Sequence, residues 1–368
     1  IANFLLVEFL VLQWNYYFKL YFNTTNLKYD FFLIFWYNFT MDFLEFNAGI
    51  DDNDRRIDKV LRNFIKDVPL SSIYKYIRKN LIKINNKKTT QDYRVKTGDV
   101  ISIAAFIIND CSENQSELKN NLQKNEENTF QKDLEIVFQN EDILILNKPY
   151  DVLVHGSDNS LDKQVENYYK KINQNKSKSL SFTPGPLHRL DRKTTGLLSF
   201  SLSLNGARWF SENIKNHTIQ KKYVSVVQNK LLHQEEWIDY IEKKSDKDNS
   251  KFHKVEVSKL KENDEQKKCI TKITPVKYGK YKNIDITFVE IEIKTGRMHQ
   301  IRAQASLHNH PLLGDTAYGG LKIEDFSQDF FLHAKELIFP SENPINLPNT
   351  VNATLPKPFL EFTNKFFD

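Results

Sequence analysis

The chain has 368 residues, 40% of them apolar and 27% charged, so it is long enough for two or three domains and apolar enough to bury a core. Its formal net charge of +5 is mildly basic and permits an anionic partner without requiring one. Cys111 and Cys269 form no Cys-x-x-Cys pair, which excludes a disulfide scaffold and a zinc ribbon and favours a reducing, cytoplasmic setting.

Residues 1–40 differ in composition from the rest of the chain. They hold 15 of its 47 aromatic residues and no methionine. Their longest apolar stretch, "FLLVEFLVLQW", is interrupted by Glu8 and is shorter than the roughly 20 residues of a membrane span. We interpret residues 1–40 as a non-native upstream segment, with translation starting at Met41. The alternative is a hydrophobic anchor, and the intact mass of the native protein decides between them.

Residues 51–106 form a small basic block, in which residues 51–104 carry 13 Lys/Arg against 7 Asp/Glu. Apolar spacing predicts a helix in "RRIDKVLRNFIKDV" and a second in "PLSSIYKYIRKNLI", followed by short strands. This fold would bring several basic side chains to one face: Arg62, Lys75, Arg78, Lys79 and Lys83. The opening Arg56-x-Asp58 and "TGDVISI" resemble the ribosomal S-four-type RNA-binding module. The alternative is an ordinary small α/β domain with a solvated basic face.

Residues 107–133 are nearly all polar and are expected to be a flexible linker. Residues 134–365 then alternate strands with a few helices. Strands are predicted in "LEIVFQNEDILILNKPYDVLVH", "GLLSFSLS", "KKYVSVVQ" and "NIDITFVEIEIK", the last with a bulge at Phe288–Val289. Helices are predicted in "NGARWFSENIKNH" and "HQIRAQASLHNH", and the charged insertion 243–268 is expected to be a surface loop. The fold class is therefore α+β: a mixed, largely antiparallel sheet after a small α/β module.

The stretch "PLHRLDRKTTGLLSF" places one carboxylate among cations. Arg189, Arg192 and Lys193 all lie within two residues of Asp191. Nearby positive charge favours the ionised carboxylate, which suits a nucleophile or a base and argues against a general acid. The alternative is a surface aspartate in a charged turn.

A second cluster lies in "KTGRMHQIRAQASLHNHPLLGD". Arg297, His299 and Arg302 surround a predicted helix start, an arrangement that favours anion binding, and Arg302 is placed to hold Asp191. The alternative is a helix with a solvated basic face. A metal site made of histidines lacks a carboxylate or cysteine at ligand spacing, so no metal is expected. The chain also lacks Gly-x-Ser-x-Gly, Walker and Gly-x-Gly-x-x-Gly motifs.

Together these stretches resemble the RluA-type pseudouridine synthases. "LHRLDRKTTGLLSF" is similar to the family's His-Arg-Leu-Asp signature. Four other motifs follow the family's order: "NEDILILNKPYDVLVHG", "KKYVSV", "TGRMHQIR" with "HPLLGD", and "LHAKELIF". With the N-terminal module, the chain is most similar to the large-subunit ribosomal RNA branch, type C more than type D. Asp151 departs from the pattern because a glycine usually follows Lys-Pro-x, while Thr195 and Met298 are milder departures.

The resemblance implies isomerisation of uridine to pseudouridine in RNA, without a cofactor. It implies Asp191 as the catalytic nucleophile, Tyr223 stacked on the uracil, and Arg302 paired with Asp191. Arg189 would hold the flipped nucleotide. The remaining RNA contacts are expected from Lys222, Arg297, His299 and the basic face of the module.

The resemblance also bears on the partner. The expected substrate is large-subunit (23S) ribosomal RNA, and the protein is expected to be a monomer without membrane association. The alternatives are a transfer-RNA pseudouridine synthase and a non-catalytic RNA-binding factor of ribosome assembly. The second alternative would be favoured if Asp191 were replaced or Arg302 absent, and both are present.

Overall fold

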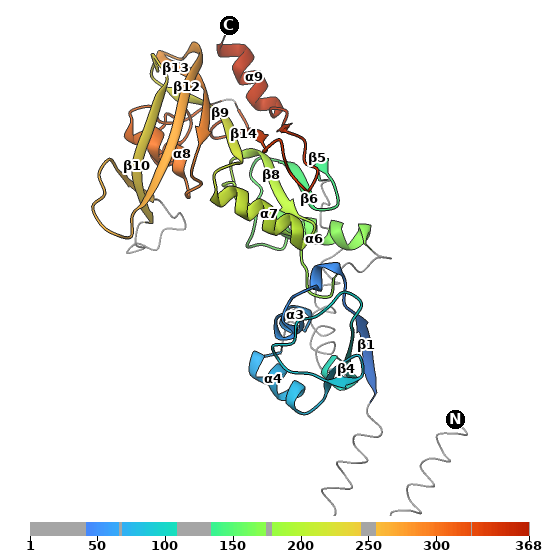
Figure 1. The fold of residues 1–368 in the computed structure, drawn as a ribbon. Helices are drawn as coiled ribbons and strands as arrows, with labels where there is room; N and C mark the ends of the chain where they lie inside the picture. Colours follow the sequence, from blue (N-terminus) through green and yellow to red (C-terminus); the bar gives the residue numbers. More distant parts are fainter. Residues whose placement is uncertain are drawn as a thin grey trace, which may run out of the picture. The chain divides into compact units, whose positions relative to one another are not determined.

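Figure 1 shows the fold in a computed structural model that describes residues 42–65, 68–108, 134–173, 179–243, 255–324 and 326–367. The segment 1–40 lies outside these residues, as does nearly all of the expected linker. The described residues form two compact units. Residues 42–48 with 54–108 form the N-terminal unit, and residues 49–53 with 134–367 form the C-terminal unit.

The N-terminal unit contains the two predicted helices and a four-stranded antiparallel sheet of order β1-β4-β2-β3, and a further helical turn begins at residue 105. The strands are β1 (Phe43–Asn47), β2 (Ile82–Ile84), β3 (Lys87–Lys88) and β4 (Val100–Ala104), and the helices are α3 (Ile57–Phe64) and α4 (Leu70–Arg78). Both predicted helices are confirmed, and their apolar faces bury Ile57, Leu61, Ile73 and Ile77. The two charged residues of the Arg-x-Asp opening bind each other, since Arg56 makes a 2.8 Å ion pair with Asp58.

One large sheet organises the C-terminal unit. Its main path is β11-β10-β12-β13-β9-β14-β8-β6-β5, with β15 beside β14 and β7 beside β8. Among the described strands, only β14 and β8 pair in parallel. The strands are β5 (Ile136–Gln139), β6 (Ile143–Lys148), β7 (Gly185–Pro186), β8 (Thr195–Ser201), β9 (Gln220–Gln228), β10 (Glu235–Lys243), β11 (Val255–Ser258), β12 (Lys267–Tyr281), β13 (Ile284–Ile293), β14 (Leu332–Ile338) and β15 (Thr350–Asn352). The predicted mixed, largely antiparallel α+β fold is confirmed.

Helices cover both faces of this sheet, which is why its central strands are apolar on both sides. In β6, Leu144 and Leu146 enter one core cluster while Ile143 and Ile145 enter another, as the two-residue period of a strand requires. The helices are α6 (Leu161–Ile172), α7 (Leu204–Lys215), α8 (Gln300–Leu307) and α9 (Lys357–Phe366). α6 and α8 contribute to the cluster of Leu144, whereas Phe210 of α7 lies with Ile143.

Two local expectations need correction. The predicted bulge at Phe288–Val289 lies instead in the partner strand β12, where the register shifts between Pro275 and Lys277 opposite those two residues. The charged insertion 243–268 is not entirely a loop, because β11 forms within it and pairs with β10. A strand is possible there because Val255 is buried while Glu256, the next residue, is exposed.

The short segment Gly49–Asn53 precedes α3 in the sequence but belongs to the C-terminal unit. Asp52 is fully buried and accepts hydrogen bonds from the hydroxyls of Ser179 and Ser181 at 2.6 and 2.7 Å and from the amide of Leu180 at 2.8 Å. Asp51 accepts a bond from the amide of Leu204. The C-terminal unit is therefore completed by residues that precede the N-terminal helices. No helix in the described ranges is long and apolar enough to cross a membrane.

Candidate active site

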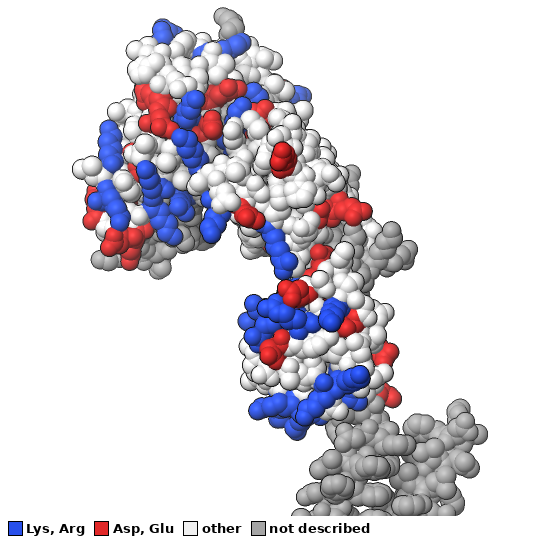
Figure 2. All heavy atoms as spheres, in the orientation of Figure 1, with Lys and Arg blue, Asp and Glu red and all other residues white. Residues whose placement is uncertain are grey.

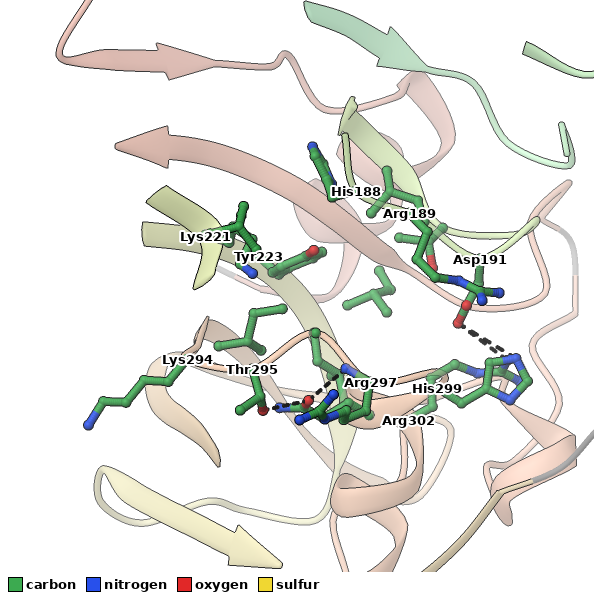
Figure 3. A pocket seen from close by; sticks show the side chains of 18 of the residues that line it. His188, Arg189, Asp191, Lys221, Tyr223, Lys294, Thr295, Arg297, His299 and Arg302 are labelled. Carbon is green, nitrogen blue, oxygen red and sulfur yellow. Dashed lines mark hydrogen bonds and ion pairs between the residues drawn. The ribbon is translucent and has the colours of Figure 1, made fainter. Parts of the chain in front are cut away.

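A pocket of about 500 Å³ opens where three parts of the C-terminal unit meet. The loop 187–194 before β8 forms one wall, the start of β9 forms a second, and the turn 294–297 with the start of α8 forms the third. Figure 3 shows the side chains that these elements direct into the pocket. They include both motif clusters of the sequence, with Asp191 on the first wall and Arg302 on the third.

A buried lysine holds the loop that carries Asp191 in place. Lys148, at the end of β6, is 1% exposed and donates hydrogen bonds to the carbonyls of Pro149 and Arg192 at 2.9 and 2.8 Å. Burial lowers the pKa of Lys148 to about 7, although the charge of Asp191 acts in the opposite direction. A neutral amine has two N–H donors, and the two carbonyls use both. Lys148 therefore ties the loop that carries Asp191, through the carbonyl of Arg192, to the end of β6.

Asp151, where the resemblance leads us to expect a glycine, has a backbone conformation that favours glycine. Its φ is +63°, in the left-handed region that side chains disfavour. Its carboxylate pairs with Arg192 at 2.9 Å, and Lys193 pairs with Asp329. Two of the three cations next to Asp191 in sequence are thus bound to other carboxylates. The expectation that all three act on Asp191 is wrong, because the loop turns their side chains away from it.

Arg302 lies between two carboxylates. It donates two hydrogen bonds to Asp315, at 2.6 and 2.8 Å, and its Nη1 lies 3.8 Å from Oδ2 of Asp191. Burial opposes its charge, but the bonds to Asp315 outweigh this and raise the pKa of Arg302. The rings of Tyr318 and Phe330 lie on the guanidinium, with ring centres 4.9 and 4.8 Å from its carbon. The guanidinium is therefore held rigidly, with Asp191 as its second and more distant carboxylate.

His299 reaches Asp191 from the turn before α8. Its Nε2 lies 3.8 Å from Oδ2 of Asp191, and its Nδ1 lies 2.9 Å from the hydroxyl of Tyr318. Burial lowers the pKa of His299, against the opposing charge of Asp191. Its φ of +53° is a strained conformation for a non-glycine residue, and such strain is common at functional sites. Asp191 is thus faced by one cation and one imidazole.

Strand β9 sorts its first residues between two faces. Lys221 and Tyr223 line the pocket, and Lys222 lies on the other face, where it pairs with Glu336 at 2.7 Å. Tyr223 is 6% exposed, and burial together with the charge of Asp191 raises the pKa of its hydroxyl. Tyr223 therefore stays a neutral phenol beside the carboxylate. The structure does not bring Lys222 to the pocket.

The other predicted site residues fall in two places. Arg189 and Arg297 are exposed and line the pocket. The predicted RNA contacts of the module lie on the two helices of the N-terminal unit or at their ends, and all four are exposed: Arg62, Lys75, Arg78 and Lys79. Basic side chains gather on the surface of this unit in Figure 2. Within the described ranges, no group of three or more His, Cys, Asp or Glu residues is arranged to hold a metal ion.

Comparison with known proteins shows which family this chain belongs to. A family model described as RNA pseudouridylate synthase matches residues 142–307, which include Asp191, Tyr223 and Arg302. The chain is 32% identical over 268 residues to the ribosomal large subunit pseudouridine synthase C of Buchnera aphidicola subsp. Schizaphis graminum, covering 72% of this chain and 77% of that protein. The chain belongs to the RNA pseudouridylate synthase family. It is an enzyme, an isomerase that acts on RNA.

Two other relatives of this synthase have names that refer to different RNAs. The ribosomal large subunit pseudouridine synthase C of Vibrio vulnificus is 28% identical over 313 residues, which cover 82% of this chain and 91% of that protein. The tRNA pseudouridine synthase C of Pectobacterium carotovorum is 31% identical over 216 residues, covering 58% of this chain and 56% of that protein.

Sequence reasoning missed four residues of the synthase's pocket and its support: Lys148, His188, Lys221 and Asp315. All four lie in stretches that had been singled out, but a linear pattern does not by itself show which polar side chain will be buried. For Lys221 a signal existed. Residues two apart in a strand share a face, so Tyr223 in the pocket implies Lys221 and excludes Lys222.

Proposed function

We propose that this synthase converts uridines of large-subunit ribosomal RNA to pseudouridine, with Asp191 as the nucleophile. The observation that carries the proposal is the position of Asp191 in the pocket, 3.8 Å from both Arg302 and His299. A carboxylate that attacks must be ionised and aimed, and a rigid cation on one side supplies both conditions. The resemblance of "LHRLD" to the family signature supports the same residue.

The proposed reaction uses the side chains of the pocket in turn. The target uridine leaves its stack, and Arg189 at the exposed rim holds the flipped nucleotide. Asp191 attacks C1′ of the ribose or assists formation of a glycal, and the bond from C1′ to N1 breaks. The uracil stacks on Tyr223, turns, and rejoins C1′ through C5, which breaks the bond between C1′ and Asp191 or, from the glycal, returns the proton to C2′, so that the carboxylate is regenerated. The proton lost from C5 and the proton gained at N1 balance, so no cofactor is consumed.

The choice of ribosomal RNA rests on two supports. The relatives that share most of this chain's length are named for the ribosomal large subunit, whereas the relative named for tRNA is similar over a shorter stretch. We also propose that residues 51–106 act as an S-four-type RNA-binding module. Its exposed cations would add salt-sensitive affinity that is independent of sequence. The free, buried Cys269 agrees with a cytoplasmic enzyme.

The decisive experiment is release of tritium from C5 of labelled uridine in RNA. Wild type is compared with Asp191→Ala and with Asp264→Ala, which removes a fully exposed aspartate elsewhere on the same unit. The substrates are protein-free large-subunit ribosomal RNA and transfer RNA. We expect release by wild type and Asp264→Ala from ribosomal RNA, and none by Asp191→Ala. Release from transfer RNA alone would overturn the substrate, and full release by Asp191→Ala would overturn the nucleophile.

A further inference from the structure

Lys221 is a buried cation for which the described residues provide no partner. Its side chain lines the pocket, it is 8% exposed, and no described carboxylate, carbonyl or hydroxyl bonds to its ammonium. The other two basic side chains buried in or beneath this site have partners, Lys148 two carbonyls and Arg302 the carboxylate of Asp315. Withdrawing an unpaired ammonium partly from water is unfavourable in the free protein. Such a group is well placed to receive a negative charge that arrives with the ligand or develops on it.

The neighbours of Lys221 fix where that charge would be. Lys221 and Tyr223 lie on the same face of β9, about 6.6 Å apart along the strand. The Lys221 ammonium also lies beside the turn before α8, because a Cβ on Gly296 would be 3.7 Å from Nζ. In Figure 3, Tyr223 lies between Lys221 and Asp191. A base stacked on Tyr223 with its ribose at Asp191 would therefore point its far edge toward Lys221.

We propose that Lys221 binds the uracil anion released during the reaction and stabilises its negative charge. This inference rests on the proposed function. When the bond from C1′ to N1 breaks, its electron pair stays with the uracil, and the charge spreads over N1, O2 and O4. The ammonium of Lys221 donates a hydrogen bond to one of these oxygens and remains protonated. The anion is then free to turn and attack C1′ through C5, which displaces the carboxylate of Asp191 from C1′, after which C5 loses its proton and N1 gains one.

Depth favours the base over a phosphate as the partner of Lys221. The phosphates of an RNA strand stay at the surface, and two exposed cations of the same pocket, Lys294 and Arg297, lie there. A flipped base enters the pocket and reaches its buried wall. The imidazole of His188 lines the same pocket. It does not compete as a cation, because burial and the charge of Lys221 lower the pKa of His188 to about 3.

The test separates chemistry from binding with variants of one residue. Lys221→Met and Lys221→Gln remove the charge, and Lys221→Arg keeps it. Lys335→Met is the matched control, since Lys335 lies on the neighbouring strand β14 and pairs with Glu290 outside the pocket. Single-turnover tritium release is measured alongside RNA affinity and its dependence on salt, and circular dichroism confirms folding. The neutral variants should lose about 10²–10³-fold in the rate constant, as is typical for one donor to a developing anion.

Affinity for RNA should change less than threefold in the same variants, and Lys221→Arg should recover part of the rate. A neutral variant that binds RNA more weakly, loses about one unit of salt slope and keeps its rate constant would make Lys221 a phosphate contact and overturn the inference. Rates equal to those of Lys335→Met would also overturn it. Failure of wild type to release tritium would instead overturn the proposed function, so the two failures are distinguishable.

Discussion

The guanidinium of Arg302 is bonded to Asp315 more closely than to Asp191. Its contacts to Asp315 are 2.6 and 2.8 Å, and its contact to Asp191 is 3.8 Å. Asp315 is 2% exposed and Arg302 is 4% exposed, so the pair is desolvated. The expected contact between Arg302 and Asp191 is present, and Asp315 is the closer partner. Asp315 holds the guanidinium of Arg302 in place, and Asp191 faces that guanidinium from a greater distance.

Replacement of Asp315 by alanine should harm both stability and activity. Breaking a buried ion pair from one side leaves an uncompensated charge, which costs about 3–5 kcal/mol of unfolding free energy. The freed guanidinium should also close on Asp191 and slow its attack. Urea unfolding and single-turnover tritium release measure the two effects. Glu324→Ala is the control, since it removes an exposed partner of Lys282 and should cost less than about 1 kcal/mol. Equal losses in the two variants would contradict this account.

Lys148 should give the synthase a stability that rises with pH. Burial lowers its pKa to about 7 in the folded state, against 10.5 for an ordinary lysine. Between these values the unfolded chain binds a proton that the folded chain does not. The free energy of unfolding of wild type, measured relative to Lys148→Met, should therefore rise by about 1.4 kcal/mol per pH unit above pH 7 and stay level below it.

Denaturant unfolding of both proteins from pH 6 to pH 9 checks this slope. Lys335→Met controls for the loss of one positive charge at a half-exposed position. A difference between wild type and Lys148→Met that stays constant over this range would mean that Lys148 is charged in the folded protein throughout.

The sequence predicts the site better than it predicts the support of the site. Motif order identifies Asp191, Tyr223 and Arg302, and the fold brings all three to one pocket. Local spacing also predicts the strands and helices that carry them. It does not predict that Lys148 lies under the Asp191 loop, because that contact joins residues 44 apart through the sheet. Such contacts depend on which residues far apart in the chain are buried or paired together, and a single sequence does not show this.

The pairing of strands shows the same limit. The motif "LHAKELIF" predicts a strand without naming its neighbours. In the fold, β14 lies between β9 and β8 and pairs in parallel with β8 through His333 and Thr195. Burial in β14 does not alternate, since Leu332, His333 and Ala334 are all buried, and its parallel partner depends on the path of the whole chain. Likewise, the two adjacent lysines in "IQKKYVSV" indicate an anionic ligand, but the sequence pattern alone does not show which of them faces it. The fold decides this, because β9 turns Lys221 and Lys222 to opposite faces.

Asp151 allows a test of backbone strain against an ion pair. Its left-handed φ costs about 1 kcal/mol in a side-chain-bearing residue, whereas its pair with the half-exposed Arg192 contributes less than about 1 kcal/mol. Asp151→Gly should therefore change the unfolding free energy by less than about 1 kcal/mol. Asp151→Ala keeps the strain and loses the pair, so it should be about 1 kcal/mol less stable than Asp151→Gly. Thermal unfolding of the three proteins tests this order, and an alanine variant at least as stable as the glycine variant would refute it.

Removal of the N-terminal module must spare residues 49–53, because Asp52 is part of the C-terminal unit. A truncation that starts at residue 54 would remove the carboxylate of Asp52 that bonds to the hydroxyls of Ser179 and Ser181, and losing the buried bond to Ser181 should cost about 1–3 kcal/mol. An internal deletion of residues 54–106 keeps that acceptor. It should preserve the stability of the C-terminal unit and the rate on short RNA fragments.

The same deletion should weaken binding to large-subunit ribosomal RNA and flatten its dependence on salt, because the exposed cations of α3 and α4 are lost. Filter binding at several salt concentrations, beside tritium release from a short fragment, measures both properties. A chain truncated at residue 54 serves as the comparison, and it should lose stability where the internal deletion does not. Unchanged affinity for ribosomal RNA at moderate salt would exclude RNA binding as the role of the module, since removing its cations would then have released no counterions.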